Sequence, residues 1–363
     1  MLVQAESLKR IVSAILEKGG SSKNESQVVG NHLVRANLVG HDSHGVGMLP
    51  RYVEMLKAEL LLPNQKPEIV KTEGSIMMFD GKRGYGQAVG KIAMEKAIEK
   101  CRETGLILMT LRNSHHLGRI GTYGEQSIEA GIVSMHFVNV TDHSPFVAPY
   151  RGSDARLSTN PICLAMPGTK NTYPVLLDMA TSRIALGKAR VAINKKENLE
   201  EGLVVDHKGQ PSNNPGVMSG YLYPEKEDNP PLGALSPLGE YKGSGLSIFC
   251  ELFGGLLSGG GTIQPGNKRH GSIINNMFTL LINPEKLVDT HWMQNEIDQL
   301  ISFYKKSPPA NPEEPVLVAG DPERFHEKER KINGIPVDKT TWDQILKDGE
   351  SLGLSRIEIK KMI

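Results

Sequence analysis

The first 62 residues carry the spacing of amphipathic helices. Apolar side chains recur every three or four residues before Gly19 and Gly20, at Leu8, Ile11, Val12, Ile15 and Leu16. This spacing predicts a helix that ends at the two glycines. Ser22 and Glu25 are spaced as a capping box, which predicts a second helix running toward Gly40. A third helix is expected over about residues 47–61, before Pro63.

From Pro67 the pattern changes to short β-prone runs. These runs are EIVKT, SIMMFD, LILMTL, IVSMHFVNV, ICLAMP, PVLLDMA and MFTLLIN. Helical patterns are interspersed or follow, at residues 90–103, 120–130, 245–257, 292–304, 322–333 and 340–352. Residues 205–240 are rich in Gly, Pro and Asn, which predicts a long surface excursion.

These elements predict an α/β (α+β) chain in three parts. Residues 1–66 form a helical N-terminal part, residues 67–310 an α/β domain, and residues 311–363 a helical C-terminal part that packs with the first. No internal repeat is visible in the sequence.

Composition excludes several classes of partner. Among 363 residues, 42 Lys and Arg balance 41 Asp and Glu, so the formal net charge is +1. Such a balance argues against nucleic acid and membrane surfaces as partners. The sequence has neither a signal-peptide pattern nor a long apolar run, and its three cysteines are far apart. These features predict a cytoplasmic protein in a reducing compartment.

The stretch GHDSHGVGMLPRY, residues 40–52, gathers two histidines, an aspartate and a serine between glycines. We predict no metal site, because the flanking glycines disfavour a regular helix and no second His or Cys cluster completes a shell. Two alternatives remain. Asp42 or Ser43 caps the following helix, or His44 contacts a substrate or cofactor from a loop.

A second stretch, NSHHLGR, lies between a predicted strand and a predicted helix. Backbone N–H groups at a helix start favour anions, and Arg119 adds a fork of donors. A histidine here has a pKa suited to general base catalysis. The alternative is that His115 and His116 satisfy carbonyl groups at the end of the strand.

Three further stretches are weaker. Asp178 ends a strand and precedes small residues, and it either contacts a ligand or caps a helix over residues 184–191. Lys242 lies beside glycines at a helix start, where it suits a phosphate or carboxylate. Residues 319–322 form a turn before a helix.

Gly84, Gly86 and Gly90 form a glycine-rich connection between a strand and a helix. It is similar to the dinucleotide fingerprint of Rossmann folds. However, the first glycine of the motif comes four positions after the last residue of the strand, and the next strand ends without an acidic residue for a ribose. We therefore favour a structural role for these glycines.

Five groups of motifs, in order along the chain, resemble the type-2 malate/L-lactate dehydrogenase family of NAD(P)-dependent oxidoreductases. They are GHDSHGVGMLPRY; NSHHLGRIG; VAPYRG with LSTNPICLAMP; LLDMATS with GKAR; and EYKGSGL with CELFGGLLSGG. The hydroxycarboxylate dehydrogenase branch is the most similar.

The resemblance implies a non-Rossmann cofactor domain on a largely antiparallel sheet, with a helical domain from both termini. It also implies a homodimer that transfers a hydride reversibly between NAD, or possibly NADP, and a 2-hydroxy or 2-oxo acid such as malate or lactate. Two alternatives are a Rossmann-type 2-hydroxyacid dehydrogenase and a non-catalytic, cofactor-binding member of the family.

The resemblance also assigns site residues. His116 matches the acid/base, and His44 matches a second histidine that serves some members as proton donor. The matched cofactor contacts are His44, Gly118, Arg119, Ile120, Asp178, Met179, Ala180, Thr181, Ser182, Tyr241, Lys242, Asn275, Ala319, Gly320, Asp321 and Pro322.

The substrate contacts implied are Ser43, Met48, Arg51 and Arg190. Many members carry an arginine where Met48 stands, and a thioether cannot neutralise a carboxylate. We therefore expect Arg51, Arg119 or Arg190 to bind the acid group, unless the substrate presents a different group.

Overall fold

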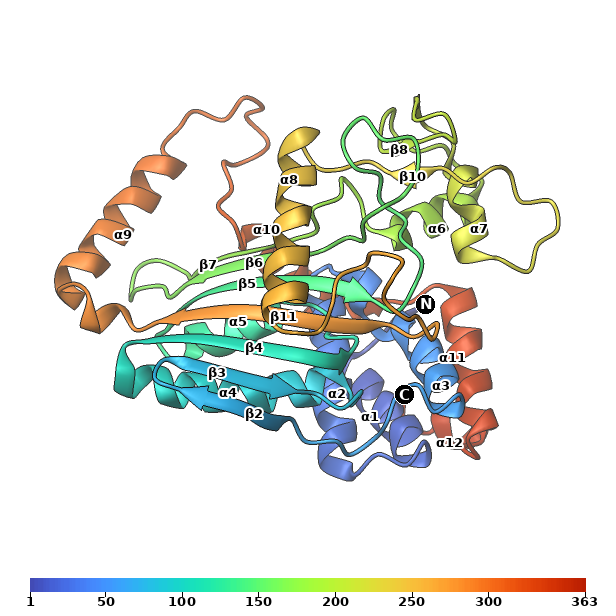
Figure 1. Cartoon of the computed structure of the whole chain (residues 1–363), viewed down its shortest axis with the longest axis horizontal. Coiled ribbons are helices and arrows are strands. Elements are labelled where there is room, and N and C mark those ends of the chain that lie inside the picture. The colour runs from blue at the N-terminus through green and yellow to red at the C-terminus, as the bar shows by residue number, and fades with distance from the viewer. The chain divides into compact units, whose positions relative to one another are not determined.

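A computed structural model describes residues 1–193 and 195–363 (Figure 1). The chain forms two compact units. Unit 1 comprises residues 1–136, 163–178 and 279–363, and unit 2 comprises residues 137–162 and 179–278. The three-part division with boundaries at 66/67 and 310/311 stays a prediction.

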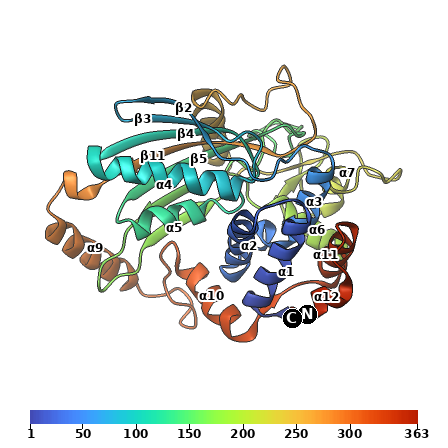
Figure 2. The same ribbon diagram turned by 90° about the horizontal axis from the view of Figure 1, so that it is seen from below.

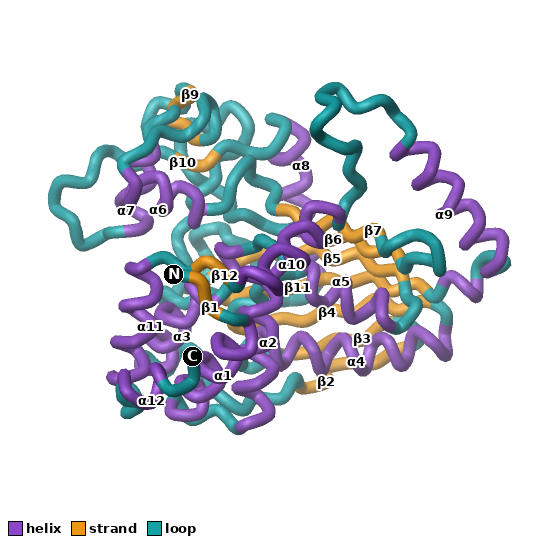
Figure 3. The backbone as a smooth tube through the Cα atoms, turned by 180° about the vertical axis from the view of Figure 1, so that it is seen from behind, coloured by secondary structure: helices purple, strands orange, loops and turns teal.

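The helical part of unit 1 is built from both ends of the chain. Its helices are α1 (Ala5–Lys18), α2 (Lys23–Leu38), α3 (Leu49–Lys57), α10 (Asp321–Asn333), α11 (Lys339–Ser351) and α12 (Arg356–Lys360). Strands β1 (Leu2–Val3) and β12 (Ile335–Pro336) pair antiparallel, and Figures 2 and 3 show the two termini close together. Apolar residues of α1, α2, α3, α11 and α12 share one core.

Local sequence explains how these helices begin and end. Leu8, Ile11 and Ile15 are fully buried, as their spacing predicted. Ser22 caps α2 by accepting a hydrogen bond from the backbone N–H of Glu25. The Glu25 carboxylate does not complete the capping box, because it accepts from the backbone N–H of Asn64 at 2.8 and 2.9 Å.

Unit 1 carries most of a seven-stranded mixed sheet with the order β2-β3-β4-β11-β5-β6-β7. The strands are β2 (Glu68–Glu73), β3 (Ile76–Asp80), β4 (Leu106–His115), β5 (Val133–Thr141), β6 (Ile162–Met166), β7 (Val175–Met179) and β11 (Ile274–Ile282). β2 pairs antiparallel with β3, and β3 pairs parallel with β4. The chain passes between the units within β5, β6, β7 and β11.

Helices α4 (Gly86–Thr104) and α5 (Gly121–Glu129) lie on one face of this sheet (Figures 2 and 3). Helix α4 connects the parallel strands β3 and β4, as parallel pairing requires. It begins four residues earlier than its apolar spacing predicted, so Gly86 lies in its first turn. This early start places the N-terminal end of α4 against the residues that follow β4.

Unit 2 contains α6 (Leu186–Lys195), α8 (Tyr241–Cys250) and a π-helix (Glu251–Leu257) that continues α8. The excursion predicted at residues 205–240 is structured. It holds β8 (Val204–Val205), β9 (Pro211–Ser212), β10 (Ala234–Leu235), a 3-10 turn (Pro215–Met218) and α7 (Ser219–Leu222). Val204, Met218 and Leu235 are fully buried in a small core, which fixes the excursion. Two-residue strands are too short to leave a period in the sequence.

Helix α9 (Thr290–Lys305) has no buried residue, although Trp292, Leu300, Phe303 and Tyr304 are large and apolar. In addition, no helix among the described residues has the length and apolarity needed to cross a membrane.

Candidate functional site

The centre of the site lies where β4 ends. His115 is the last residue of β4, His116 follows it, and α5 begins at Gly121. Gly86 of α4 packs directly on this segment, since a Cβ at Gly86 would overlap the carbonyl oxygens of His115 and His116. A Cβ at Gly90 would similarly reach the ring of Tyr123 at 2.8 Å. These glycines therefore allow α4 to pack closely against the site.

The GHDSHG stretch folds as two 3-10 turns, Asp42–His44 and Val46–Met48. Asp42 accepts hydrogen bonds from Asn37 at 2.6 Å and from Arg330 of α10 at 2.7 and 2.9 Å. His41 Nε2 lies 3.1 Å from Glu323 of the same helix. Helix α10, from the C-terminal part of the chain, thus anchors the loop that carries His44.

The helix-capping alternative for Asp42 and Ser43 is wrong. The N-cap of α3 is Met48, which makes no side-chain cap, and a Pro lies in the first turn of the helix. Asp42 is instead engaged by Arg330, and the Ser43 hydroxyl lies 3.0 Å from His44 Nδ1. A fixed φ at proline makes a side-chain cap dispensable here.

The structure brings His44 and His116 together. Their rings stack with centroids 5.5 Å apart and planes 14° apart. His116 Nδ1 lies 2.7 Å from the hydroxyl of Tyr52, which in turn accepts a hydrogen bond of 2.7 Å from Gln87 Nε2. A histidine with one nitrogen held by a second group is typical of acid/base sites.

Sequence reasoning missed Tyr52 and Gln87. Tyr52 closes the quoted stretch GHDSHGVGMLPRY, and Gln87 follows Gly86 in the first turn of α4. Both side chains are buried, with 0% and 1% of their surface exposed. A polar residue that follows a close-packing glycine at a helix start was the available signal for Gln87.

Burial sets the charge of the histidines near this centre. It lowers the pKa of His44 to about 4, helped by His41 and Arg119 and opposed by the Asp178 carboxylate. It lowers the pKa of His32 and of His115 to about 3. His44 is therefore neutral near pH 7, with both a donor and an acceptor nitrogen on its ring.

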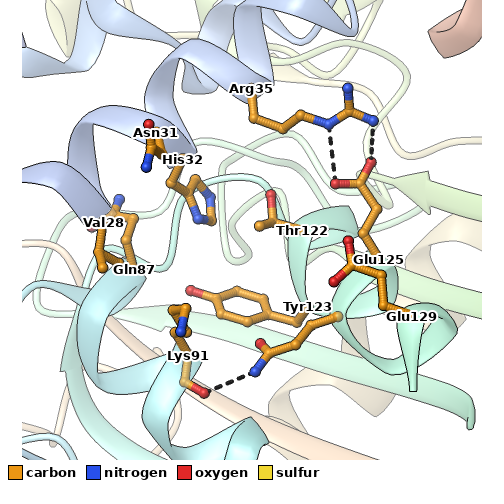
Figure 4. A pocket seen from close by; sticks show the side chains of 11 residues that line it. Val28, Asn31, His32, Arg35, Gln87, Lys91, Thr122, Tyr123, Glu125 and Glu129 are labelled. Atoms are coloured by element: carbon orange, nitrogen blue, oxygen red, sulfur yellow. Dashed lines mark hydrogen bonds and ion pairs between the residues drawn. The ribbon is translucent and has the colours of Figure 1, made fainter. Parts of the chain in front are cut away.

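Arg119 does not face solvent. Its side chain is fully buried, with Nη1 2.9 Å from Glu125 and Nε 3.8 Å from Asp178. Arg35 holds Glu125 from the other side with two hydrogen bonds (Figure 4). Although burial alone would raise it, the pKa of Glu125 is held below its ordinary value by Arg119 and Arg35.

The anion position predicted at the start of α5 is filled by a carboxylate of the chain itself. Asp178, at the end of β7, accepts a 2.7 Å hydrogen bond from the backbone N–H of Gly121. Asp178 therefore caps α5, and not α6, whose N-cap is Ala185. Gly118 lies three positions before Gly121 and has a φ of +73°. A Cβ at Gly118 would lie 2.6 Å from His32 Nε2. Ile120, the residue before α5, is buried.

Other predicted residues of unit 1 lie around this group. Met48 is half-buried and packs against the helical core, while Arg51 pairs with Glu54 at 2.6 Å. In the turn at residues 319–322, Ala319 accepts from the Leu176 N–H of β7. Asp321 pairs with Lys305 and Arg324, Gly320 has a φ of +96°, and Pro322 opens α10.

The remaining predicted residues form a second group, in unit 2. Their described side chains comprise Met179, Ala180, Thr181, Ser182, Arg190, Tyr241, Lys242 and Asn275. Thr181 donates to the carbonyl of Thr159 or Asn160, and Asn275 donates to the carbonyl of Asn139 at 3.1 Å. Tyr241 and Lys242 begin α8 and are exposed, so their side chains are accessible at the N-terminus of a helix.

Four histidines with lowered pKa values predict an acid-sensitive fold. His32, His44, His115 and His136 have folded pKa values of about 3 to 4, below the ordinary value of about 6.5. Between these values the unfolded chain binds more protons, so the free energy of unfolding falls as pH falls from about 6.5 to about 4. Each histidine contributes up to about 1.4 kcal/mol per pH unit.

Urea unfolding at a series of pH values measures this effect. His136→Gln should flatten the dependence by about one proton, because His136 is buried between Thr279 and Ser134. The exposed His291→Gln is the control and should leave the slope unchanged. A stability that is constant from about pH 6.5 to about pH 4 contradicts the prediction.

Comparisons with known proteins show which family the chain is similar to. A family model described as malate/L-lactate dehydrogenase matches residues 3–346. Hydroxycarboxylate dehydrogenase B of Escherichia coli O157:H7 is 39% identical, over 96% of this chain and 94% of the relative. L-lactate dehydrogenase of Cupriavidus necator is 36% identical, over 98% of this chain and 99% of the relative.

Solved structures extend the similarity to the fold. The structure of a putative malate/lactate dehydrogenase from E. coli superposes with a TM-score of 0.92 at 37% identity, covering 100% of this chain and 98% of the other. Both the family model and these relatives span nearly the whole sequence. The chain therefore belongs to the type-2 malate/L-lactate dehydrogenase family.

Proposed function

We propose that this protein is an NAD(P)-dependent dehydrogenase that transfers a hydride reversibly between the nicotinamide and a 2-hydroxy or 2-oxo carboxylic acid. The main observation in support of this proposal is the stacked pair of His44 and His116, in which His116 is held by Tyr52. Relatives named as hydroxycarboxylate, lactate, malate and sulfolactate dehydrogenases support this class of substrate.

The polar groups of unit 2 fit a dinucleotide. The exposed Lys242 ammonium at the start of α8 suits a phosphate, and the exposed Tyr241 ring suits a flat base. Near Thr181, Ser158 Oγ and Asn160 Oδ1 are buried polar atoms without a hydrogen-bond partner among the described residues. When bound, the cofactor supplies the hydride acceptor or donor of the reaction.

In this proposal His116 moves the proton. During oxidation its neutral ring accepts the hydroxyl proton of the substrate, and during reduction its imidazolium returns that proton to the carbonyl oxygen. His44 is half-buried and neutral near pH 7, so it orients the substrate or the nicotinamide by hydrogen bonding without adding a charge. Ser43 supports this orientation through His44 Nδ1.

The acid group of the substrate needs a cation that Met48 does not supply. Arg119 is the weakest of the three candidates, because its guanidinium is fully buried beside Glu125 and Asp178. Arg51 lies on α3, one turn after Met48, and its partner Glu54 is mostly exposed. We therefore favour Arg51 or Arg190 as the carboxylate-binding residue of the proposed site.

The close packing of Gly86 and Gly90 supports a non-Rossmann cofactor domain. Protein atoms fill the space beside both glycines, where a Rossmann fingerprint would leave the backbone open to a pyrophosphate. The Rossmann-type dehydrogenase is therefore the weaker alternative. The non-catalytic alternative is decided by turnover.

A substrate panel tests the proposal. NADH and NADPH are each titrated by fluorescence, and their absorbance is then followed with a panel of 2-oxo acids that includes oxaloacetate, pyruvate and sulfopyruvate. Turnover of at least one acid is expected. Cofactor binding without turnover on any acid would support the non-catalytic alternative, and no binding of either cofactor would overturn the proposal.

We further propose a homodimer. Large apolar side chains are exposed on α8 with its π-helix and on α9; those with more than about a third of their surface exposed are Leu246, Ile248, Phe249, Leu252, Leu256, Leu257, Trp292, Leu300, Phe303 and Tyr304. Exposed apolar surface of this kind is typical of subunit interfaces. The family resemblance implies that a second copy of the chain covers these apolar side chains.

Light scattering after size exclusion tests the homodimer. The wild type should elute with the mass of two chains. Leu300→Glu with Phe303→Glu should give single chains, since burying unpaired carboxylates in an apolar interface costs much free energy. Asn295→Asp with Gln299→Glu adds the same charge to exposed polar positions of α9 and should remain dimeric. A wild type that elutes as a single chain contradicts this part of the proposal.

A further inference from the structure

Three side chains form a hydrogen-bonded series that ends on His116. Gln87 lies in the first turn of α4, Tyr52 lies on α3, and His116 follows β4. Gln87 Nε2 donates to the Tyr52 hydroxyl at 2.7 Å, and that hydroxyl lies 2.7 Å from His116 Nδ1. Gln87 and Tyr52 are buried, so neither bond competes with bulk water.

The direction of these bonds determines the tautomer of His116. An amide nitrogen can only donate, so the Tyr52 oxygen accepts from Gln87. The single hydrogen of Tyr52 then points to His116 Nδ1, which must accept it. A neutral His116 in this arrangement carries its own proton on Nε2, and Nε2 has no lone pair with which to act as a base.

The opposite direction requires the Gln87 amide to turn. With Oε1 toward Tyr52, the tyrosine donates to Gln87 and its oxygen accepts from His116 Nδ1–H. This second arrangement leaves Nε2 of neutral His116 unprotonated, and it also satisfies the imidazolium. It is therefore the arrangement that acid/base catalysis needs in both directions of the reaction.

The surroundings of Gln87 give the amide room to turn. Gln87 lines a cavity of about 280 Å³ between α2, α4 and α5, together with His32, Thr122 and Tyr123 (Figure 4). Among the described residues, Gln87 Oε1 has no hydrogen-bond partner, so turning the amide breaks no bond at that atom. The buried His32 Nε2 on the same wall also lacks a partner among these residues.

We propose that rotation of the Gln87 amide sets, through Tyr52, which nitrogen of His116 carries the proton. Gln87 and Tyr52 are thus positioning residues for the reaction. The inference rests on the proposed role of His116 in catalysis. Other ionisable groups surround this series. His44 is stacked on His116, and the rings of His115 and Tyr85 contact Tyr52. His32 and Tyr123 line the cavity with Gln87. Arg51 acts on His115 through its charge.

Nitrogen-15 NMR of labelled histidine tests the inference without turnover. At about pH 8 the wild type should show His116 protonated on Nε2, with the signal assigned by its loss in His116→Gln. Gln87→Glu presents only acceptors when ionised, so it should move the proton to Nδ1. The control Gln126→Glu makes the same chemical change in the wall of the same cavity and should leave the tautomer unchanged. An identical tautomer in the wild type and Gln87→Glu overturns the inference.

The pH profile of the oxidation gives a second readout. Gln87→Glu stabilises the imidazolium, so the rise of kcat with pH should move to higher pH by about one unit. Gln87→Met removes the acceptor that the imidazolium arrangement needs, so the rise should move to lower pH by a similar amount. A merely structural role would not produce opposite shifts at one position, and parallel shifts or none overturn the inference.

The two readouts separate this inference from the proposed function. If the wild type turns over no acid, the proposed function fails, and the tautomer experiment still decides the role of Gln87. If the wild type turns over an acid and the Gln87 variants keep its tautomer and pH profile, only the inference fails. Thermal unfolding of each variant checks that it is folded, and Gln87→Met serves through its pH profile if Gln87→Glu does not fold.

Discussion

Replacing His116 with alanine should lower kcat by about 10²-fold or more while the protein still binds NADH. In the proposed reaction His116 is the group that accepts or returns the substrate proton, and His44 cannot substitute for it. His44 is neutral near pH 7, because burial lowers its pKa to about 4. A proton donor would need to be the charged imidazolium, and His44 would rarely be in that form near pH 7.

Steady-state kinetics with the best acid of the panel, in both directions, measures the loss. NADH fluorescence gives the binding constant separately, so a failure to bind the cofactor is not mistaken for a loss of chemistry. The exposed His291→Ala on α9 is the matched control and should keep wild-type turnover. Near-wild-type kcat in His116→Ala would contradict the assignment of His116 as the acid/base. A larger loss of kcat in His44→Ala would assign that role to His44.

Arg119→Met should lower the free energy of unfolding by about 3–5 kcal/mol, as expected when one partner of a buried ion pair is removed. Its guanidinium is fully buried and lies 2.9 Å from Glu125 and 3.8 Å from Asp178. Methionine fills part of the space, but it leaves Asp178 with only its backbone hydrogen bond from Gly121 among the described residues. Glu125 is less affected, because Arg35 remains bound to it.

Urea unfolding at about pH 7 measures this loss. Arg156→Met removes an exposed pair with Asp154 and should leave the free energy of unfolding almost unchanged, because solvent screens such pairs. Combining Arg119→Met with Asp178→Asn should recover part of the stability, because the amide buries no charge. If Arg119→Met unfolds like the wild type, the buried cluster does not stabilise the fold as the distances indicate.

Much of the architecture was predictable because its signals are local. The apolar residues of α1 recur every three to four positions, and the strands from β2 to β7 are short β-prone runs in the sequence. The structure confirms both predictions. The proximity of His44 and His116 was implied only by resemblance, since 72 positions separate them in the sequence. Two turns and a strand end bring the rings together, and no local pattern encodes that distance.

The unpredicted features depend on partners distant in the sequence. Asp178 caps α5 at Gly121, 57 residues away, so its local context suggested α6 instead. Tyr52 and Gln87 become informative only when α3 and α4 meet at the end of β4. The strands β8, β9 and β10 have two residues each, and their pairing, rather than their sequence, defines them.

The anchoring of Asp42 by Arg330 has a consequence for how the protein matures. The two residues are 288 positions apart, so the loop that carries His44 lacks this anchor until α10 has been synthesised. At about 5–20 residues per second, a ribosome needs on the order of 15–60 s to add that stretch. A nascent chain can therefore form α1 and α2 well before it holds His44 in place, and the site is completed only near the end of translation.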